Sequence, residues 1–288
     1  MAWIETILNG LMLGGLYALF GLGLSLIFGV MRIANIAHGE LVIAGAFLAF
    51  TVTGAVPIHP FILLPVVVLV MFGVGYALQA GLVNHVLGTD PLRPLLLTFG
   101  LSIVVQNLLV ELFGADNRAL DPGPLRTASL DLGPLSLGVL PLGTFLVALA
   151  LFGALHWALA HTGWGRMVRA TSDDPEIVAL MGVDRRRVFA SVMGLSAALA
   201  AIAGMLLAMR TSITPFSGTE RLLIAFEVIV IGGLGSIWAS LLGGLALGVV
   251  HALGFRLDPA SGLLYGHLLL LVILLARPEG LAGKRKVR

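Results

Sequence analysis

Long apolar runs separated by short polar connections make up most of the chain. An α-helix needs about 20 apolar residues to cross a bilayer, and most of these runs approach or exceed that length. Five of them precede the most charged internal stretch: Thr6–Val30, Leu41–Val56, Phe61–Val86, Leu95–Phe113 and Leu142–Ala160. Three follow it: Phe189–Met209, Leu222–Leu253 and Leu263–Ala276. The pattern predicts an all-α membrane protein, built as a polytopic helical bundle.

One of these runs, Leu222–Leu253, is too long for a single crossing. Small residues interrupt it at Gly232, Gly233, Gly235 and Ser236. Two short helices that meet at this break are the better interpretation, because broken helices are common in transporters. Counted in this way, the bundle has about eight or nine transmembrane segments.

The most charged internal stretch, Gly163–Arg187, reads GWGRMVRATSDDPEIVALMGVDRRR. A charge at the bilayer centre costs roughly 3 kcal/mol or more, so this stretch must lie in water. Its excess of arginine favours the cytoplasmic side of the membrane.

Local signals predict a short helix inside this stretch. Asp174 suits an N-cap, Pro175 the first helical position, and Glu176 the positive end of the helix dipole. Gly182 can end the helix in the left-handed conformation, so the helix should span Pro175–Met181. Its apolar side carries Ile177, Leu180 and Met181. From the residues alone, a solvated helical connector and a docking knob for a soluble partner are equally good interpretations.

The basic C-terminal tail, RPEGLAGKRKVR, is expected on the same side as the arginine-rich stretch. An even number of crossings must then separate the two, which holds if Leu222–Leu253 counts as two segments. Five segments precede the stretch, so the N-terminus should face outside. This orientation also places the larger share of the 17 lysines and arginines inside.

A faint internal repeat is also visible. Ile36–Ala46 (IAHGELVIAGA) and Ile224–Leu234 (IAFEVIVIGGL) share Ile, Ala, Val, Ile and Gly when aligned without gaps. Chance similarity between apolar stretches is the alternative. With the expected topology the two halves would be inverted repeats, which are frequent in transporters. The expected organisation is one membrane domain over 1–288, with a first repeat 6–113, a linking helix 142–160, a cytoplasmic loop 163–188, a second repeat 189–276 and a basic cytoplasmic tail 277–288.

Composition narrows the class of protein further. Of the 288 residues, 58% are hydrophobic and 11% are charged, and the mean hydropathy is +1.04. Soluble domains carry about 25% charged residues, so a polytopic membrane protein is indicated. The net charge of +2 is small and is explained by basic cytoplasmic ends, without a nucleic-acid-binding patch. Because cysteine is absent, disulfides, thiol catalysis and cysteine-ligated metals are excluded.

Polar residues inside the apolar segments are the candidates for a solute pathway. A broken helix leaves free backbone N–H and C=O groups that a polar solute can use. For His38 and Glu40 the alternative is a position at the membrane edge, facing water. That alternative is weaker for Glu227, because apolar residues follow it directly. The expected translocation-path residues are Asn35, His38, Glu40, Glu227, Gly232, Gly233, Gly235 and Ser236.

Patterns typical of enzymes are not visible in the sequence. There is no Ser-His-Asp or HExxH arrangement and no P-loop, so the chain has no visible means of hydrolysing ATP. Four histidines are scattered along the second half of the chain and suggest no metal site: His156, His161, His251 and His267. We expect neither catalytic residues nor a cofactor bound by this chain.

Four blocks spread in order over nearly the whole chain carry a family resemblance. They read NGLMLGGLYALFGLGLSLIFGVMRIANIAHGELVIAGAF, RATSDDPEIVALMGV, FEVIVIGGLGSIWASLLGG and ARPEGLAGK. These blocks resemble the LivH-type permeases of bacterial branched-chain amino acid ABC transporters. The resemblance implies a permease subunit in the bacterial inner membrane, carrying leucine, isoleucine, valine or a related amino acid. It also implies three kinds of partner: a LivM-type second permease, two cytoplasmic ATPases that hydrolyse the ATP, and a periplasmic binding protein.

The resemblance gives the short cytoplasmic helix a role. Glu176, Ala179 and Gly182 fall where the family has a helix that docks into a groove on the ATPase, which fits an apolar helix face. The implied coupling residues are Asp174, Pro175, Glu176, Ala179, Leu180 and Gly182. The connections Gly114–Pro141 and Arg210–Arg221 would face the binding protein.

Two other functions remain open from the residues. A stand-alone proton-coupled secondary transporter of a small polar solute, with Glu40 or Glu227 as its proton site, explains the inverted halves but not the capped helix. A membrane-embedded enzyme using His38 and Glu40 lacks a second catalytic cluster at a credible spacing. A neighbouring gene for an ATPase would favour the importer, whereas solitary activity in liposomes would favour the secondary transporter.

Overall fold

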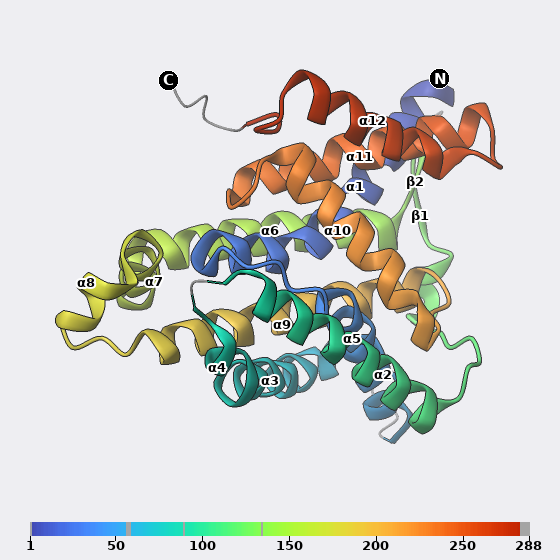
Figure 1. The fold of residues 1–288 in the computed structure, drawn as a ribbon. Coiled ribbons are helices and arrows are strands. Elements are labelled where there is room, and N and C mark those ends of the chain that lie inside the picture. The colour runs from blue at the N-terminus through green and yellow to red at the C-terminus, as the bar shows by residue number, and fades with distance from the viewer. Residues whose placement is uncertain (1, 56–58, 89, 134, 283–288) are drawn as a thin grey trace.

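The computed structural model describes residues 2–55, 59–88, 90–133 and 135–282, and most of this chain is helical (Figure 1). The helices are α1 (Ala2–Met31), α2 (His38–Ala55), α3 (Pro60–Leu78), α4 (Asn84–Val86), α5 (Leu92–Phe113), α6 (Val139–His161), α7 (Gly163–Asp173), α8 (Pro175–Leu180), α9 (Arg185–Arg210), α10 (Gly218–Gly232), α11 (Ile237–Leu257) and α12 (Gly262–Ala276). A π-helical turn, Gln79–Val83, joins α3 to α4, and 3-10 turns span Gly123–Arg126 and Pro215–Ser217. Val56 and residues 283–288 of the predicted basic tail lie outside the described residues.

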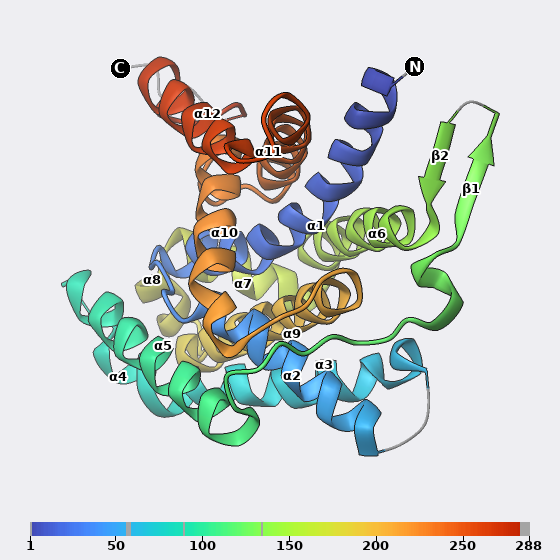
Figure 2. The ribbon, with the colours of Figure 1, turned by 90° about the vertical axis from the view of Figure 1, so that its right-hand side faces the viewer.

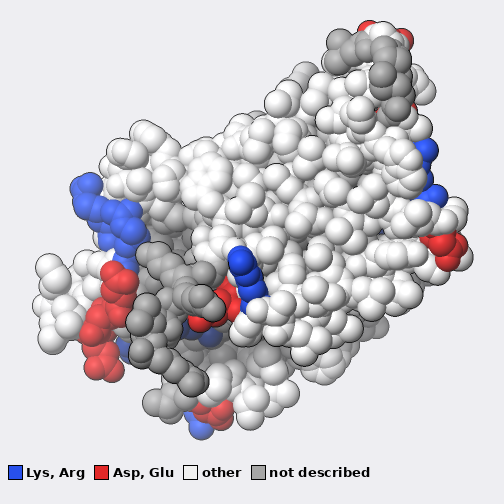
Figure 3. Space-filling model, turned by 90° about the horizontal axis from the view of Figure 1, so that it is seen from above, with Lys and Arg blue, Asp and Glu red and all other residues white. Residues whose placement is uncertain are grey.

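The predicted polytopic helical bundle is confirmed. Among the described residues, seven helices are long and apolar enough to cross a membrane: α1, α2, α3 to α4 taken together, α5, α6, α9 and α11. Helix α12 is a shorter apolar helix, and α10 has 15 residues that include Glu220, Arg221 and Glu227. Figure 3 shows charged side chains gathered mainly towards opposite ends of one face, with uncharged surface between them.

The sequence predicts a loop over Gly114–Pro141, and here the structure differs. This connection contains an antiparallel hairpin of β1 (Ser129–Leu132) and β2 (Leu135–Gly138), paired from Ser129↔Gly138 to Leu132↔Leu135. The hairpin stands beside the start of α6 (Figure 2). The strands are short and lie among prolines and aspartates, which explains why the alternation of SLDL and LSLG did not stand out as strand.

A second difference concerns Gly163–Asp173, where the sequence predicts charged loop but the structure has α7. The Thr162 hydroxyl caps this helix by accepting a hydrogen bond from the backbone N–H of Gly165 at 3.0 Å. Gly165 also lets α7 lie directly against α6, since a Cβ there would overlap the carbonyl oxygen of Leu159. Val168 is buried, so α7 is an amphipathic helix. Its apolar stripe is narrow and is hard to recognise in the sequence because arginines lie between the apolar residues.

Helices α1 and α9 form the centre of the bundle, and glycine lets other helices approach their backbones. A Cβ at Gly14 of α1 would lie 2.7 Å from the carbonyl oxygen of Gly244 in α11, and one at Gly204 of α9 would overlap the carbonyl oxygen of Val42 in α2. Helices in lipid are held together mainly by such close packing, because no hydrophobic effect drives them together. The two most buried spans, α1 and α9, both use small residues at such contacts.

The helices of the two predicted repeats pack reciprocally. Helix α1 of the first predicted repeat packs against α11 and α10 of the second, and α9 of the second packs against α3 and α2 of the first. The repeat itself stays a prediction from the sequence. The aligned segments are not equivalent, however: Ile36–Ala46 begins before α2, whereas Ile224–Leu234 begins inside α10. The starts of α2 and α10 meet instead, at Gly39 and Gly218.

The predicted break in the run Leu222–Leu253 is confirmed. Helix α10 ends at Gly232, and Gly233 and Gly235 have φ angles of 128° and 77°, which other residues rarely adopt. The hydroxyl of Ser236 then caps α11. The segment after α12 closes over the break, because the backbone N–H of Leu281 donates to the carbonyl of Ile231 at 2.8 Å.

We expect Gly204→Ala to destabilise the protein by about 1–3 kcal/mol, because the added methyl group forces α9 away from α2. The measurement is thermal unfolding of the purified protein in detergent. Gly100→Ala in α5 is the matched control, since no atom lies within 4 Å of a Cβ there. Equal melting temperatures for the two variants would show that the contact with Val42 is not tight.

Candidate functional site

Helix α8 is built as the sequence predicts. Asp174 has extended backbone, and its Oδ1 accepts hydrogen bonds from the backbone N–H groups of Glu176 at 2.9 Å and Ile177 at 3.0 Å. Pro175 occupies the first turn, where a missing N–H costs nothing. At the other end Gly182 has φ 82°, and the N–H of Val183 donates to the carbonyl of Val178 at 3.3 Å. A cap and a glycine stop thus define the helix locally.

The apolar face of α8 is exposed. Ile177, Leu180 and Met181 are 56%, 89% and 78% exposed, whereas Val178 is buried and anchors the helix. Helices α7 and α8 project at one end of the bundle, and the β-hairpin lies at the opposite end (Figure 1). An apolar tip at a charged end of the molecule is typical of an interaction surface. The geometry therefore favours the docking interpretation over a solvated connector.

The first group of predicted path residues is buried at the start of α2. His38 is 0% and Glu40 is 3% exposed, so the alternative that they face water at a membrane edge is wrong. The Nε2 of His38 donates to the carbonyl oxygen of Phe20 at 2.9 Å. Asn35 turns the chain into α2, because its Oδ1 accepts from the N–H of Ala37 at 3.1 Å. His38 and Asn35 are thus held by structural hydrogen bonds.

Glu40 packs against the start of α10. A Cβ added at Gly218 would overlap the carboxylate of Glu40, so only glycine fits there. The carboxylate of Glu40 thus lies at the first residue of α10. Glu40 Oε2 is buried without a hydrogen-bond partner among the described residues. The contact links the two halves of the chain at one point.

Glu227 lies further along α10 and has a different partner, His267 of α12, with which it forms a hydrogen bond. The structure therefore divides the predicted path carboxylates between two places. The side chain of Glu227 is buried, whereas that of His267 is 53% exposed. His267 is the only His, Asp, Glu, Lys or Arg in α12. The sequence analysis missed it, although a lone ionisable residue in an apolar run was an available signal.

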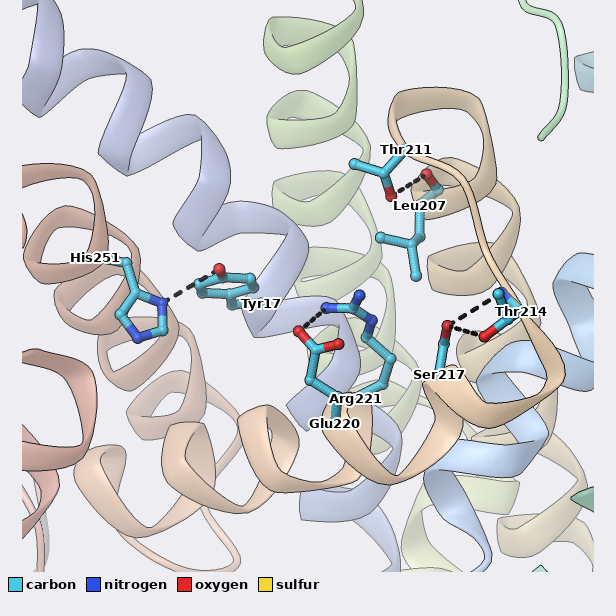
Figure 4. Close-up of polar contacts among 8 residues, drawn as sticks. All are labelled: Tyr17, Leu207, Thr211, Thr214, Ser217, Glu220, Arg221 and His251. Atoms are coloured by element: carbon cyan, nitrogen blue, oxygen red, sulfur yellow. Dashed lines mark hydrogen bonds and ion pairs between the residues drawn. The ribbon is translucent and has the colours of Figure 1, made fainter. Parts of the chain in front are cut away.

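The Glu227–His267 pair is part of a larger group of polar side chains, which we name the intramembrane polar cluster: Tyr17, Glu220, Arg221, Glu227, His251 and His267. The Tyr17 hydroxyl lies 3.2 Å from His251 Nδ1, and Arg221 Nη1 lies 3.0 Å from Glu220 Oε1 (Figure 4). His251 packs on Gly266, directly beside His267. The cluster thus connects α1, α10, α11 and α12.

Several atoms of the intramembrane polar cluster have unused hydrogen-bonding capacity. Arg221 Nε, Glu227 Oε2 and His251 Nε2 are buried and have no partner within the described part of the chain. Unpaired buried polar groups are costly, and they are rare unless they have a functional role. The imidazole of His267 is half-exposed, and contact between a polar ring and lipid hydrocarbon is unfavourable. This face of α12 must therefore contact water or protein.

The glycine break is located near α7. Gly29 of α1 lies close to Gly235, since a Cβ on Gly29 would be 3.1 Å from the carbonyl oxygen of Gly235. The hydroxyl of Ser172 in α7 donates to the carbonyl oxygen of Gly29 at 2.7 Å. Gly235 and Ser172 also border one cavity of about 220 Å³. The break therefore lies at the end of the bundle where α7 and α8 are found.

The described residues contain no group of three or more His, Cys, Asp or Glu side chains that could hold a metal ion. The available chemistry consists of hydrogen bonding and charge inside the bundle, together with an apolar docking tip outside it. Such a combination suits transport coupled to a partner.

Comparison with known proteins decides the family. A family described as "Branched-chain amino acid transport system / permease component" matches residues 6–276. The chain belongs to this family. It is a permease component of an ABC importer and a multi-pass membrane protein, as the sequence resemblance indicated.

Individual relatives agree with this assignment. The permease is 28% identical to the high-affinity branched-chain amino acid permease BraD of Pseudomonas aeruginosa, over 99% of this chain and 97% of BraD. It is 30% identical to a probable LivH permease of Methanocaldococcus jannaschii, over 97% of this chain and 92% of the relative. A shorter match, 37% identical over 44% of this chain and 39% of the relative, is to the fructose import permease FrcC of Rhizobium meliloti. No solved structure matches the permease significantly.

We expect Gly182→Ala to loosen α8, because the left-handed conformation costs an alanine about 1–2 kcal/mol. Hydrogen–deuterium exchange of the α8 amides should become about fivefold to thirtyfold faster. Gly163→Ala is the control, since the nearest atom to a Cβ at Gly163 is 3.7 Å away and its backbone is ordinary. Identical exchange in both variants would mean that the glycine stop does not hold α8.

Proposed function

We propose that this permease carries branched-chain or closely related amino acids through the inner membrane, as one subunit of an importer. Its partners are a LivM-type second permease, two cytoplasmic ATPases and a periplasmic binding protein. The ATP is hydrolysed by the partner subunits, and this chain has no catalytic site or cofactor of its own. The branched-chain cargo is supported by the names of BraD and LivH, each aligned over nearly the whole chain.

The exposed apolar tip of α8 is the observation that carries the proposal. Ile177, Leu180 and Met181 would enter a groove on an ATPase, in the manner of an amphipathic helix that fills a hydrophobic groove. This places α8 and the end of the chain in the cytoplasm, and the N-terminus and the hairpin on the periplasmic side. In Figure 1 the N-terminus lies at the hairpin end, as this orientation requires, and the last described residues lie over the break between α10 and α11.

The cargo path is proposed to run beside the intramembrane polar cluster. The exposed side of His267 would face the second permease or the water-filled path between the two permeases. Glu227 would attract the ammonium group of the amino acid, since its Oε2 has a free position for a hydrogen bond. The residues at the start of α2 would support the meeting point of the two halves. Gly233 and its neighbours would act as the joint between α10 and α11.

Leu180→Asp combined with Met181→Asp should abolish co-purification of the ATPases, because each buried apolar side chain contributes about 1.5–3 kcal/mol. Both side chains are exposed, so the permease itself should fold and insert normally. The measurement is affinity purification of the tagged permease from its native membrane, followed by identification of the associated proteins. Leu130→Asp, at an exposed position of the hairpin, is the control and should retain the ATPases.

Two outcomes would contradict the importer. One is full ATPase association in the Leu180 and Met181 variant. The other is solute uptake by the isolated chain in liposomes under a proton gradient, which would identify a stand-alone secondary transporter.

Glu227→Gln should reduce amino acid uptake by the assembled importer about tenfold or more, since a hydrogen bond to a charged group contributes about 1.5–3 kcal/mol. Glutamine can still bond to His267, so assembly should be unchanged and the loss can be assigned to the charge. Uptake is measured in proteoliposomes that contain all subunits and the binding protein. Glu111→Gln, which removes an exposed carboxylate from α5, is the control. Unchanged uptake in the Glu227 variant would exclude the cluster from the path.

A further inference from the structure

A cavity of about 610 Å³ lies beside α8 and shares no lining residue with the intramembrane polar cluster. Five segments that are distant in sequence form its walls: the end of α1, the end of α4, and the starts of α5, α8 and α9. Three arginines border it, Arg32, Arg185 and Arg186, together with a single acid, Glu176. The cavity is therefore basic.

None of the three arginines forms an ion pair in the described part of the chain, whereas neighbouring Arg187 pairs with Asp184 at 3.2 Å. Arg185 and Arg186 also begin α9, where the positive end of the helix dipole disfavours cations. Their placement lowers the stability of the isolated helix and raises the attraction of the cavity for an anion.

The backbone conformation of Arg32 is also energetically unfavourable. Its φ of 54° makes it the only non-glycine residue with a left-handed backbone among those described. Such a conformation is unfavourable for a long side chain, and it brings Arg32 to the cavity directly after α1 ends.

Hydrogen bonds hold in place the wall of the cavity that α4 forms. The π-helical turn brings Gln79 and Asn84 together, with Gln79 Nε2 donating to Asn84 Oδ1 at 3.0 Å. Asn84 Nδ2 in turn donates to the carbonyl oxygen of Arg186 at 3.2 Å. The start of α4 is thereby tied to the first turn of α9, which gives the cavity a defined shape.

The cavity also has apolar walls. Met31, Leu87 and Phe189 line it. A ligand suited to the site therefore combines an anionic head with apolar chains.

We propose that this cavity binds the phosphate headgroup of an anionic phospholipid. Arg185, Arg186 and Arg32 contact the phosphate, and the acyl chains begin along the apolar side chains of Met31, Leu87 and Phe189. Basic pockets at the cytoplasmic ends of membrane helices suit such lipids, because that leaflet is rich in anionic headgroups. The choice of leaflet rests on the cytoplasmic position of α8 in the proposed function, whereas binding itself does not depend on cargo or ATPases.

The test uses the full-length permease, purified and stripped of lipid, without its partners. Short-chain phosphatidylglycerol is added, and the unfolding temperature is followed as a function of lipid concentration. Phosphatidylglycerol should raise the unfolding temperature, and phosphatidylcholine with the same acyl chains should not. In the double variant Arg185→Gln with Arg186→Gln the affinity for phosphatidylglycerol should fall about tenfold or more, since each basic residue near a headgroup contributes about 1 kcal/mol.

Arg166→Gln with Arg169→Gln is the matched control, because it removes the same charge from the neighbouring α7 without touching this cavity. Its affinity for phosphatidylglycerol should equal that of the unchanged protein. Three results would overturn the proposal: equal losses in the two double variants, an equal shift produced by inorganic phosphate alone, or unchanged lipid affinity in the Arg185 and Arg186 variant. Impaired ATPase association together with the last result would assign the arginines to a protein contact.

Discussion

Direct contact between helix backbones is the constraint on which the rest of the structure depends. Water cannot drive helices together inside a bilayer, so the bundle is held by close packing. Gly14 and Gly204 permit this packing for the two central helices, α1 and α9. Where backbones touch, there is little room for polar side chains. The functional candidates accordingly lie where helices start or break, as at Asn35 and Gly233, or on the faces of α10 and α12.

The same packing suggests how the two ends of the permease communicate. Helix α8 is anchored by Val178, and α7 reaches α1 through the hydrogen bond from Ser172 to Gly29. Gly29 in turn lies against Gly235 in the break between α10 and α11. In the proposed importer, a displacement of α8 by an ATPase would reach the break through these contacts. The basic cavity occupies the other side of α8, so a bound lipid would steady the same junction from outside the transport path.

Features with a local cause could be predicted from the sequence. The cap at Asp174 and the stop at Gly182 each depend on a few neighbouring residues, and both are present in the structure. The break at Gly233 has the same local character. Two elements were not predicted, because their sequence signals are weak. They are the short strands around Gly133 and the helix α7, whose apolar stripe is interrupted by arginines. The predicted register of the repeat was wrong, because similarity between apolar stretches carries little information about position.

The sequence by itself determined that the chain is a polytopic helical membrane protein with a capped and exposed helix α8, because hydropathy, charge and capping act over short distances. Only the tertiary structure decided which polar residues are buried and which meet. Glu227 and His267 are brought together by the crossing of α10 and α12, and Arg32 and Arg185 by the meeting of α1 and α9 at one cavity. Such pairs depend on how closely helices can cross, which is set by small residues elsewhere in the chain.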